Sequence, residues 1–188
     1  MIARLLYRLT ANRPCRLIKQ PDGNPYLERY FLFHLLGWTC YLHRFVGSDG
    51  DRNLHNHPWR FAFSILLTGW YQEWRGKQIM SWESILARSD VVLLDQTKLR
   101  KVSRINLITR HTFHQIAVIK PNTWTLFLHT RWRWRWGFLT NSIGRYRTDG
   151  RTYFYRDWAG SQDHVKHWWK APNCPTGNTV NREPFSTK

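Results

Sequence analysis

Acidic residues are scarce in this sequence. Only 12 Asp and Glu stand against 29 Lys and Arg in 188 residues, which gives a formal net charge of +17. The imbalance is greatest from Lys98 to Arg156, where thirteen basic residues face a single acid, Asp149. Such a charge favours nucleic acid or small phosphorylated and carboxylated molecules as partners, and it does not bear on the fold.

Cysteines and long apolar runs are scarce as well. The three cysteines, Cys15, Cys40 and Cys174, are widely spaced and odd in number, which excludes a disulfide framework and a cysteine-based zinc motif. No apolar run approaches the length of a membrane span, and no secretory pattern is visible. We therefore expect a protein of the reducing cytoplasm, without a transmembrane segment.

Short runs rich in aromatic and β-branched residues dominate the middle of the chain. Glycines and polar clusters separate them, and no long helical pattern lies between them. Many short strands at near-regular spacing predict an all-β sandwich or barrel in one domain. The expected strands are 30–36, 38–46, 60–67, 70–74, 91–94, 105–108, 114–119 and 124–129.

The two ends of the chain differ from this pattern. Leu5, Leu6 and Leu9 are at helical spacing and predict a short amphipathic helix, and the prolines that follow indicate a loop. We assign residues 1–28 to this helix and loop, and 29–170 to the barrel with a basic, aromatic C-terminal region. Residues 171–188 are rich in Pro, Asn, Thr and Gly, which predicts an extended or disordered tail.

Histidines provide the strongest chemical signal. His55 and His57 are one residue apart, so on an extended chain both side chains point to the same side. His114 begins a later predicted strand and can supply a third imidazole. Three imidazoles on one side of a divalent metal leave positions open for water, dioxygen or substrate.

The spacing of His55, His57, the turn residue Gly69 and the later His114 resembles the two motifs of the cupin superfamily. The run His-Asn-His-Pro-Trp, with the later Trp-Gly-Phe at 136–138, is similar to uncharacterised cupin-like proteins of bacteria and phages. This resemblance implies a double-stranded β-helix, or jelly-roll, barrel. It also implies that His55, His57 and His114 bind a divalent metal.

Two departures from the cupin pattern affect the expected chemistry. Ala62 occupies the position of the family's ligating glutamate, and Thr109 and His111 replace the usual Pro and Gly. A site with three neutral imidazoles resembles the iron site of thiol dioxygenases and favours Fe(II) with an anionic substrate; Zn, Ni and Mn stay open. Glu73 is a candidate to replace the missing carboxylate, and His111 is a reserve ligand.

Further residues near the histidines have two interpretations each. Arg52 and Arg60 flank the motif and can clamp a carboxylate or phosphate, or else pair with nearby Asp residues at the surface. Tyr71 and Glu73 share one face of their strand, where they can transfer protons or simply line the barrel. Because cupins are often dimers, a homodimer is an expectation too.

The run from Arg131 to Trp136 alternates Arg and Trp. On a strand the two residue types face opposite ways, which predicts a barrel strand with Trp inside and Arg in solvent. The resulting basic face would suit nucleic acid. Its candidate residues are Arg131, Arg133, Arg135, Arg145 and Arg147.

Three functions remain open from the sequence. The leading one is a metal-binding cupin, an iron-dependent dioxygenase or oxygenase acting on a small anionic substrate. The second is a non-enzymatic nucleic-acid-binding protein of viral or phage type. The third is a metal-free cupin isomerase or epimerase in which a barrel histidine is the base.

Overall fold

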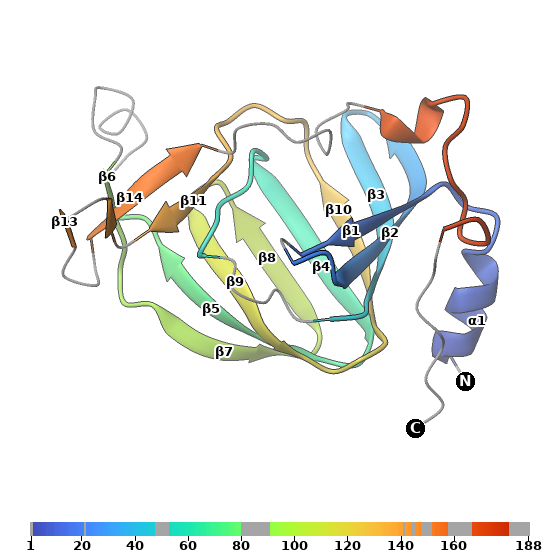
Figure 1. The fold of residues 1–188 in the computed structure, drawn as a ribbon, viewed down its shortest axis with the longest axis horizontal. Coiled ribbons are helices and arrows are strands. Elements are labelled where there is room, and N and C mark those ends of the chain that lie inside the picture. The colour runs from blue at the N-terminus through green and yellow to red at the C-terminus, as the bar shows by residue number, and fades with distance from the viewer. Residues whose placement is uncertain are drawn as a thin grey trace.

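Antiparallel strands make up most of the fold in the computed structural model (Figure 1). The structure describes residues 2–20, 22–47, 53–79, 91–140, 142–143, 146–147, 152–157 and 167–180. The first layer is a six-stranded sheet with the order β1-β2-β3-β10-β4-β8. Its strands are β1 (Cys15–Lys19), β2 (Pro25–Leu35), β3 (Trp38–Phe45), β10 (Thr123–His129), β4 (Phe61–Thr68) and β8 (Ile105–Thr109).

The second layer is built from two three-stranded sheets. One has the order β7-β5-β9 and the other β11-β14-β6. Their strands are β7 (Lys98–Val102), β5 (Tyr71–Lys77), β9 (Thr112–Ile119), β11 (Gly137–Thr140), β14 (Thr152–Asp157) and β6 (Val91–Leu93). A further short pair joins β12 (Ser142–Ile143) to β13 (Tyr146–Arg147).

Side chains between the layers form the core of the barrel. Leu27 and Phe45 from the six-stranded sheet pack with Tyr71, Val102 and Ile116 from the sheet opposite. The prediction of an all-β fold is confirmed, since two layers of antiparallel strands face each other across one interior.

All eight strands expected from apolar runs are present, but four longer strands were missed. β1 and β7 are edge strands, and in β7 only Val102 is buried, so charged residues obscure the pattern. β11 is too short to give a clear apolar run, and β14 mixes aromatic with charged residues. β1 also corrects the prediction of a loop between the N-terminal helix and residue 28.

The predicted N-terminal helix is confirmed as α1 (Ile2–Leu9). Its Ala3, Leu6 and Tyr7 pack on the outer face of the six-stranded sheet, against a cluster that includes Tyr30 and Trp124. Among the described residues, no helix is long and apolar enough to span a membrane.

The segment after the short helix η2 (Trp168–Lys170) lies beside the N-terminal segment and contains turns at 172–173 and 177–179, so this part of the predicted tail is not extended. Cys15 N donates to Pro175 O at 2.7 Å, and Gly177 N donates to Arg13 O at 3.0 Å. The part of the predicted tail from 181 to 188 lies outside the described residues.

The outward side of β4 is apolar. Phe61, Phe63, Ile65 and Leu67 are each 37% exposed and alternate with inward residues. An apolar row of this kind suits a protein partner. The homodimer expected from the sequence stays a prediction.

Candidate metal centre

The three histidines predicted from sequence converge in the barrel. Their ligating nitrogens all lie within 4.8 Å of one another. Nε2 of His57 is 2.9 Å from Nε2 of His114. Two imidazole nitrogens bound to one metal at about 2.1 Å each are about 3 Å apart, so this separation suits a shared ion. A donor set of three imidazoles fits a divalent metal such as iron or zinc.

Backbone pairing places His55 between two strands of the second layer. His55 N donates to His114 O at 3.0 Å, and His114 N donates back to His55 O at 2.9 Å. On the other side, Leu139 N donates to Leu54 O at 2.7 Å. The segment around His55 therefore acts as a one-residue strand between β9 and β11, which fixes two ligands directly opposite each other.

Asn56, between the two motif histidines, points the other way and is fully buried. Its Oδ1 accepts hydrogen bonds from Gly137 N at 2.9 Å and Tyr155 OH at 3.3 Å. Its Nδ2 donates to Arg135 O at 3.3 Å. Asn56 thereby ties the metal motif to the segment before β11. Sequence reasoning missed this role, although a polar residue between two inward histidines was its signal.

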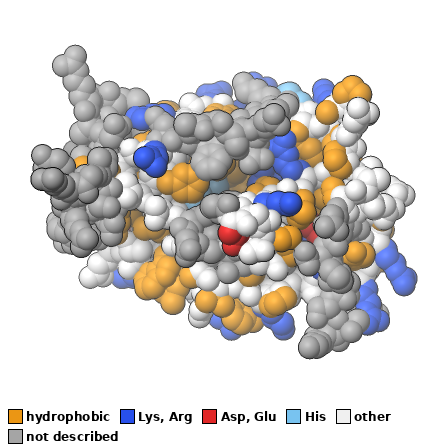
Figure 2. Space-filling view, viewed as in Figure 1, with side chains coloured by type: hydrophobic (Ala, Val, Ile, Leu, Met, Phe, Trp, Pro, Cys, Tyr) orange, Lys and Arg blue, Asp and Glu red, His pale blue; other side chains and the backbone are white. Residues whose placement is uncertain are grey.

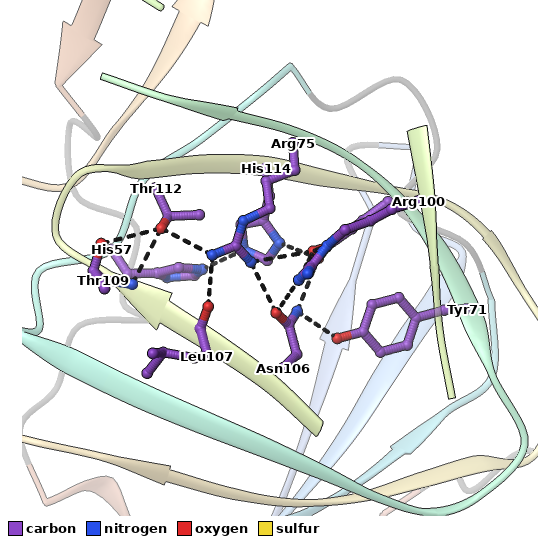
Figure 3. Close-up of polar contacts among 10 residues, drawn as sticks. His57, Tyr71, Arg75, Arg100, Asn106, Leu107, Thr109, Thr112 and His114 are labelled. Atoms are coloured by element: carbon purple, nitrogen blue, oxygen red, sulfur yellow. Dashed lines mark hydrogen bonds and ion pairs between the residues drawn. The ribbon is translucent and has the colours of Figure 1, made fainter. Parts of the chain in front are cut away.

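Glu73 on β5 orients His114, which is labelled in Figure 3 together with Arg100 and Asn106. Nδ1 of His114 lies 2.9 Å from Oε2 of Glu73, and because a carboxylate only accepts, Nδ1 carries the proton. In the neutral imidazole this places the lone pair of His114 on Nε2, the nitrogen that faces His57. Carboxylate–histidine pairs of this kind fix the tautomer and raise the basicity of a metal ligand.

The Glu73 cluster consists of Glu73 with His114, Arg75, Arg100 and Asn106. Arg100 Nε donates to Glu73 Oε1 at 2.8 Å, and Asn106 Nδ2 donates to Oε2 at 3.0 Å. Arg75 lies 3.3 Å from Oε1. Burial raises the pKa of Glu73, but the hydrogen bond from His114 and the charge of Arg100 outweigh it and lower that pKa to about 2.

These contacts change the roles expected of Glu73 and Tyr71. Glu73 is completely buried and its oxygens accept from four residues, which places it behind His114; its role in catalysis stays a prediction. Tyr71 lines the cavity beside it and accepts a hydrogen bond from Asn106 at 2.7 Å. Burial and the Glu73 charge raise the pKa of Tyr71, which keeps its hydroxyl protonated.

His57 is held in its neutral form, the form that can bind a metal. Burial lowers its pKa well below the usual value, and the nearby His55 and His114 lower it further. The His57 ring stacks on Trp59 with centroids 4.6 Å apart and planes 12° from parallel. The tryptophan after the motif therefore orients the His57 ring.

A cavity of about 170 Å³ opens beside the three histidines. Aromatic side chains form much of its wall, among them Trp59, Phe127, Trp136 and Phe138. Ala62, at the family's glutamate position, is buried in an apolar cluster with Ile108 and Phe127. The described lining contains cationic side chains but no Asp or Glu.

Of the two arginines expected to clamp a substrate, Arg52 lies outside the described residues, and Arg60 does not line this cavity. Arg60 is exposed and lines a separate hollow with Arg131 and Arg133. The cationic side chains of the cavity are instead Arg16 on β1 and Arg29 on β2, which no motif marked.

The predicted strand through the Arg–Trp run is wrong. Residues 131–136 form an irregular segment at the cavity mouth, paired only by an isolated bridge from Trp132 to Trp59. Arg133 N donates a hydrogen bond to Pro58 O, which holds this segment beside the residue that follows His57. The Arg and Trp side chains therefore do not alternate between two faces as they would on a strand. Trp132 and Trp136 line the cavity.

The basic face expected from this run is only partly described. Arg131 and Arg133 are exposed, whereas the Arg135 guanidinium lies over the Tyr155 ring at 5.0 Å. Arg145 lies outside the described residues, as does the side chain of Arg147.

No protein-family model matches the sequence, and no curated protein matches it either. Among solved structures, the chain is similar to a cupin 2 conserved barrel domain protein from Rhodopseudomonas palustris. The TM-score is 0.45 and the identity 16%, over 67% of this chain and 77% of that one. KdgF from Halomonas sp. gives a TM-score of 0.40 at 13% identity, over 57% and 80% of the two chains.

Fe(II)-HppE with the alternative substrate (S)-1-HPP gives a TM-score of 0.42 at 14% identity. This match covers 63% of the present chain and 55% of the other, so the chain spans about half the length of that protein.

Proposed function

We propose that this chain is a metal-binding, cupin-like oxygenase in which His55, His57 and His114 hold one divalent ion, with Fe(II) as the first candidate. The observation that carries the proposal is the orientation of His114 by Glu73, which aims a lone pair at the neighbouring His57. Zinc, nickel and manganese are alternatives that the same nitrogen donors accept.

A bound Fe(II) ion would supply open positions for dioxygen and for a small anionic substrate. The protein's own residues would do the rest. Glu73 holds the Nδ1 proton of His114, and burial keeps His57 neutral. The aromatic wall around Trp59 and Trp136 limits the access of water to the site.

Metal analysis tests this proposal first. Protein purified without a histidine tag should contain, or take up anaerobically, one ion per chain, and His57→Ala should contain none. His111→Ala is the matched control, since His111 is half-buried outside the three-histidine group and should leave metal content unchanged. Failure of the wild type to bind any of the four metals contradicts the proposal.

Activity is the second test. The Fe(II)-loaded protein should consume dioxygen in the presence of small organic acids, and chelation should stop the reaction. Turnover that survives complete metal removal would favour the metal-free isomerase or epimerase instead.

Nucleic-acid binding is the second candidate function. It is supported by the hollow of about 290 Å³ in which Arg60, Arg131 and Arg133 surround Thr130 and Trp38. No described residue of its lining is acidic. Lys and Arg are also spread over the face seen in Figure 2, where Asp and Glu are few. Three cations beside an aromatic ring suit the phosphates and bases of a single strand.

Salt dependence tests this candidate. If the three arginines neutralise three phosphates, affinity for a single-stranded oligonucleotide should fall about 20-fold between 50 mM and 200 mM salt. Replacing Arg60, Arg131 and Arg133 together with Gln should remove most of this dependence in a fluorescence-anisotropy titration. Absence of binding by the wild type at low salt would eliminate the candidate.

A further inference from the structure

The outer face of the six-stranded sheet reverses the pattern expected for a sheet face in water. An antiparallel strand with one face in solvent normally places its apolar residues inward and its polar residues outward. On β4 the inward residues Ala62 and Ser64 are small and buried. The outward, exposed residues are Phe61, Phe63, Ile65 and Leu67. The solvent side of this strand therefore carries the larger apolar side chains.

Neighbouring strands extend this apolar surface in both directions. On one side, β8 places Ile105, which is 65% exposed, opposite Ile65. On the other side, β10 places Leu126 opposite Ile65, and Leu126 packs with the cluster that holds Leu6 of α1. Residues paired across antiparallel strands project to the same face. One apolar surface therefore runs from α1 across β10 and β4 to β8.

The helix α1 adds an apolar stripe of its own. Ile2, Leu5 and Leu9 are each more than half exposed, and their spacing places them on one side of the helix. Arg4 and Arg8 are exposed as well. The contacts of α1 with the sheet come from other residues, so this stripe does not serve the core. A short helix with leucine and arginine exposed together suits a water–lipid interface.

The charged side chains of these elements are all cationic. α1, β4 and β8 contain no Asp or Glu, and Arg4 and Arg8 lie on α1. Arg60 directly precedes β4, and its guanidinium lies over the ring of Phe61 at 5.3 Å. Arg104 directly precedes β8, and both of these arginines are exposed. Cations therefore accompany the apolar surface at α1 and at the start of each strand.

Charge decides between the partners that such a surface suits. Because the chain carries a net charge of +17, two copies of it repel each other, whereas an anionic surface attracts it. Nucleic acid is anionic too, but it is held through hydrogen bonds and aromatic stacking. Most of the exposed side chains on α1, β4 and β8 are aliphatic and offer neither. An anionic lipid surface matches both the apolar side chains and the arginines.

We propose that this outer face docks on an anionic lipid surface, with the apolar side chains of α1, β4 and β8 at the interface. Arg4, Arg8, Arg60 and Arg104 lie among the headgroup phosphates. Binding of this kind grows with the apolar area that is buried and with the attraction of cations to anionic lipid. Docking needs neither the metal nor the cavity, because the outer face points away from the barrel interior.

Vesicle binding tests the proposal. The purified protein should sediment with vesicles of mixed phosphatidylcholine and phosphatidylglycerol. It should bind vesicles of phosphatidylcholine alone at least about 10-fold more weakly, because only the mixed vesicles are negatively charged. Added salt should weaken binding to the mixed vesicles without abolishing it, since salt screens the arginines but not the apolar contact.

One pair of substitutions tests the apolar contribution. Ile105→Thr combined with Leu107→Thr removes exposed apolar area from β8 and keeps every charge, so binding to mixed vesicles should weaken at least about 10-fold. The matched control is Leu99→Thr combined with Val118→Thr, at exposed apolar positions on β7 and β9 in the second layer. This control should bind as the wild type does.

A second pair tests the charge. Arg4→Gln combined with Arg8→Gln removes two cations from α1 and should weaken binding to mixed vesicles at least about 10-fold. Lys77→Gln combined with Lys98→Gln is the matched control, because it removes the same charge from exposed positions on β5 and β7. Its binding should change much less.

Three results would overturn the proposal. They are no binding to mixed vesicles at low salt, equal binding to both kinds of vesicle, and unchanged binding by the folded β8 pair variant. A wild type that ignores vesicles and forms a dimer, which the β8 pair variant dissociates in analytical ultracentrifugation, would assign the face to a second copy. A thermal melt shows which variants are folded. If the β8 pair does not fold, Ile105→Thr alone replaces it, since Ile105 is the more exposed of the two.

Discussion

Two buried carboxylates, Glu73 and Glu28, make similar contacts but serve different parts of the molecule. Both are completely buried and both are paired with arginine. Glu73 faces the barrel interior and holds His114. Glu28, on the outer face of the six-stranded sheet, accepts from Arg44 at 2.8 Å and from the Tyr30 hydroxyl.

The Glu28 cluster, formed by Glu28, Tyr30, Arg44 and Asn122, leads to the N-terminal helix. Arg44 donates to Asn122 Oδ1, and its guanidinium lies over the ring of Tyr7 on α1 at 5.2 Å. A buried carboxylate with arginine is therefore not by itself a functional sign. What distinguishes Glu73 is a partner imidazole whose second nitrogen faces other metal ligands.

The largest expected effect comes from removing that imidazole. His114→Ala should leave Glu73 with arginine and amide partners only, much like Glu28, and metal content should fall from one ion per chain to none. Elemental analysis measures this. His34→Ala is a control, because His34 lies on β2 outside the three-histidine group. Retention of stoichiometric metal by His114→Ala would show that the ion is held elsewhere.

Glu28→Gln should separate stability from metal binding. It removes the carboxylate charge that pairs with the buried Arg44, which costs about 3 kcal/mol of unfolding free energy. Urea denaturation measures the loss, and metal affinity of the folded protein should be unchanged. Weaker metal binding in this variant would mean that the two clusters are coupled across the sheet.

Glu73→Gln should show the opposite of Glu28→Gln, with its main effect on metal affinity. A neutral amide is a poorer acceptor for the His114 Nδ1–H, so metal affinity should fall about 10- to 100-fold while the three ligands remain. Competition with a chromophoric chelator measures the change. Affinity equal to that of the wild type would assign Glu73 a role in stability alone, like that of Glu28.

The sequence predicted the convergence of the three histidines because its signal is local. Spacing places His55 and His57 on one side of the chain, and the start of a strand supplies His114. The sequence did not reveal that Glu73 contacts His114, and it offered Glu73 only as a ligand or proton-transfer residue. Whether a carboxylate meets a metal or the far nitrogen of a ligand depends on strand register, here the pairing of β5 with β9.

Long-range contacts also explain the errors elsewhere. No sequence motif marks Arg29. Its place in the cavity depends on β2 lying across the barrel from β9, the strand that carries His114. The Arg–Trp run has the alternation of a strand, yet hydrogen bonds to Pro58 hold it as an irregular segment at the mouth. The alternation of apolar and polar residues predicts helices and strands well. It does not reveal which backbone groups elsewhere in the chain an irregular segment will bind.

Lowering the pH should reduce the stability of the protein through groups on the inner face of the six-stranded sheet, in contrast to the outer face that holds Glu28. On the inner face, burial lowers the pKa of His129 from 6.5 to about 4. The hydrogen bond to Thr130 O raises this pKa, and the charges of Arg29 and His34 lower it further. A depressed histidine pKa means that the unfolded chain binds the proton first. Stability is therefore lost as pH falls below 6.5 and continues to fall until about pH 4.

The expected loss from His129 is about 2 kcal/mol between pH 7 and pH 5. Glu73, with a folded pKa of about 2, keeps its contribution over this range and loses it only below pH 4.5. Urea denaturation of the metal-free protein at pH 7 and pH 5 measures the difference, and His129→Gln should reduce it. An unchanged pH dependence in His129→Gln would place the acid sensitivity outside this part of the barrel.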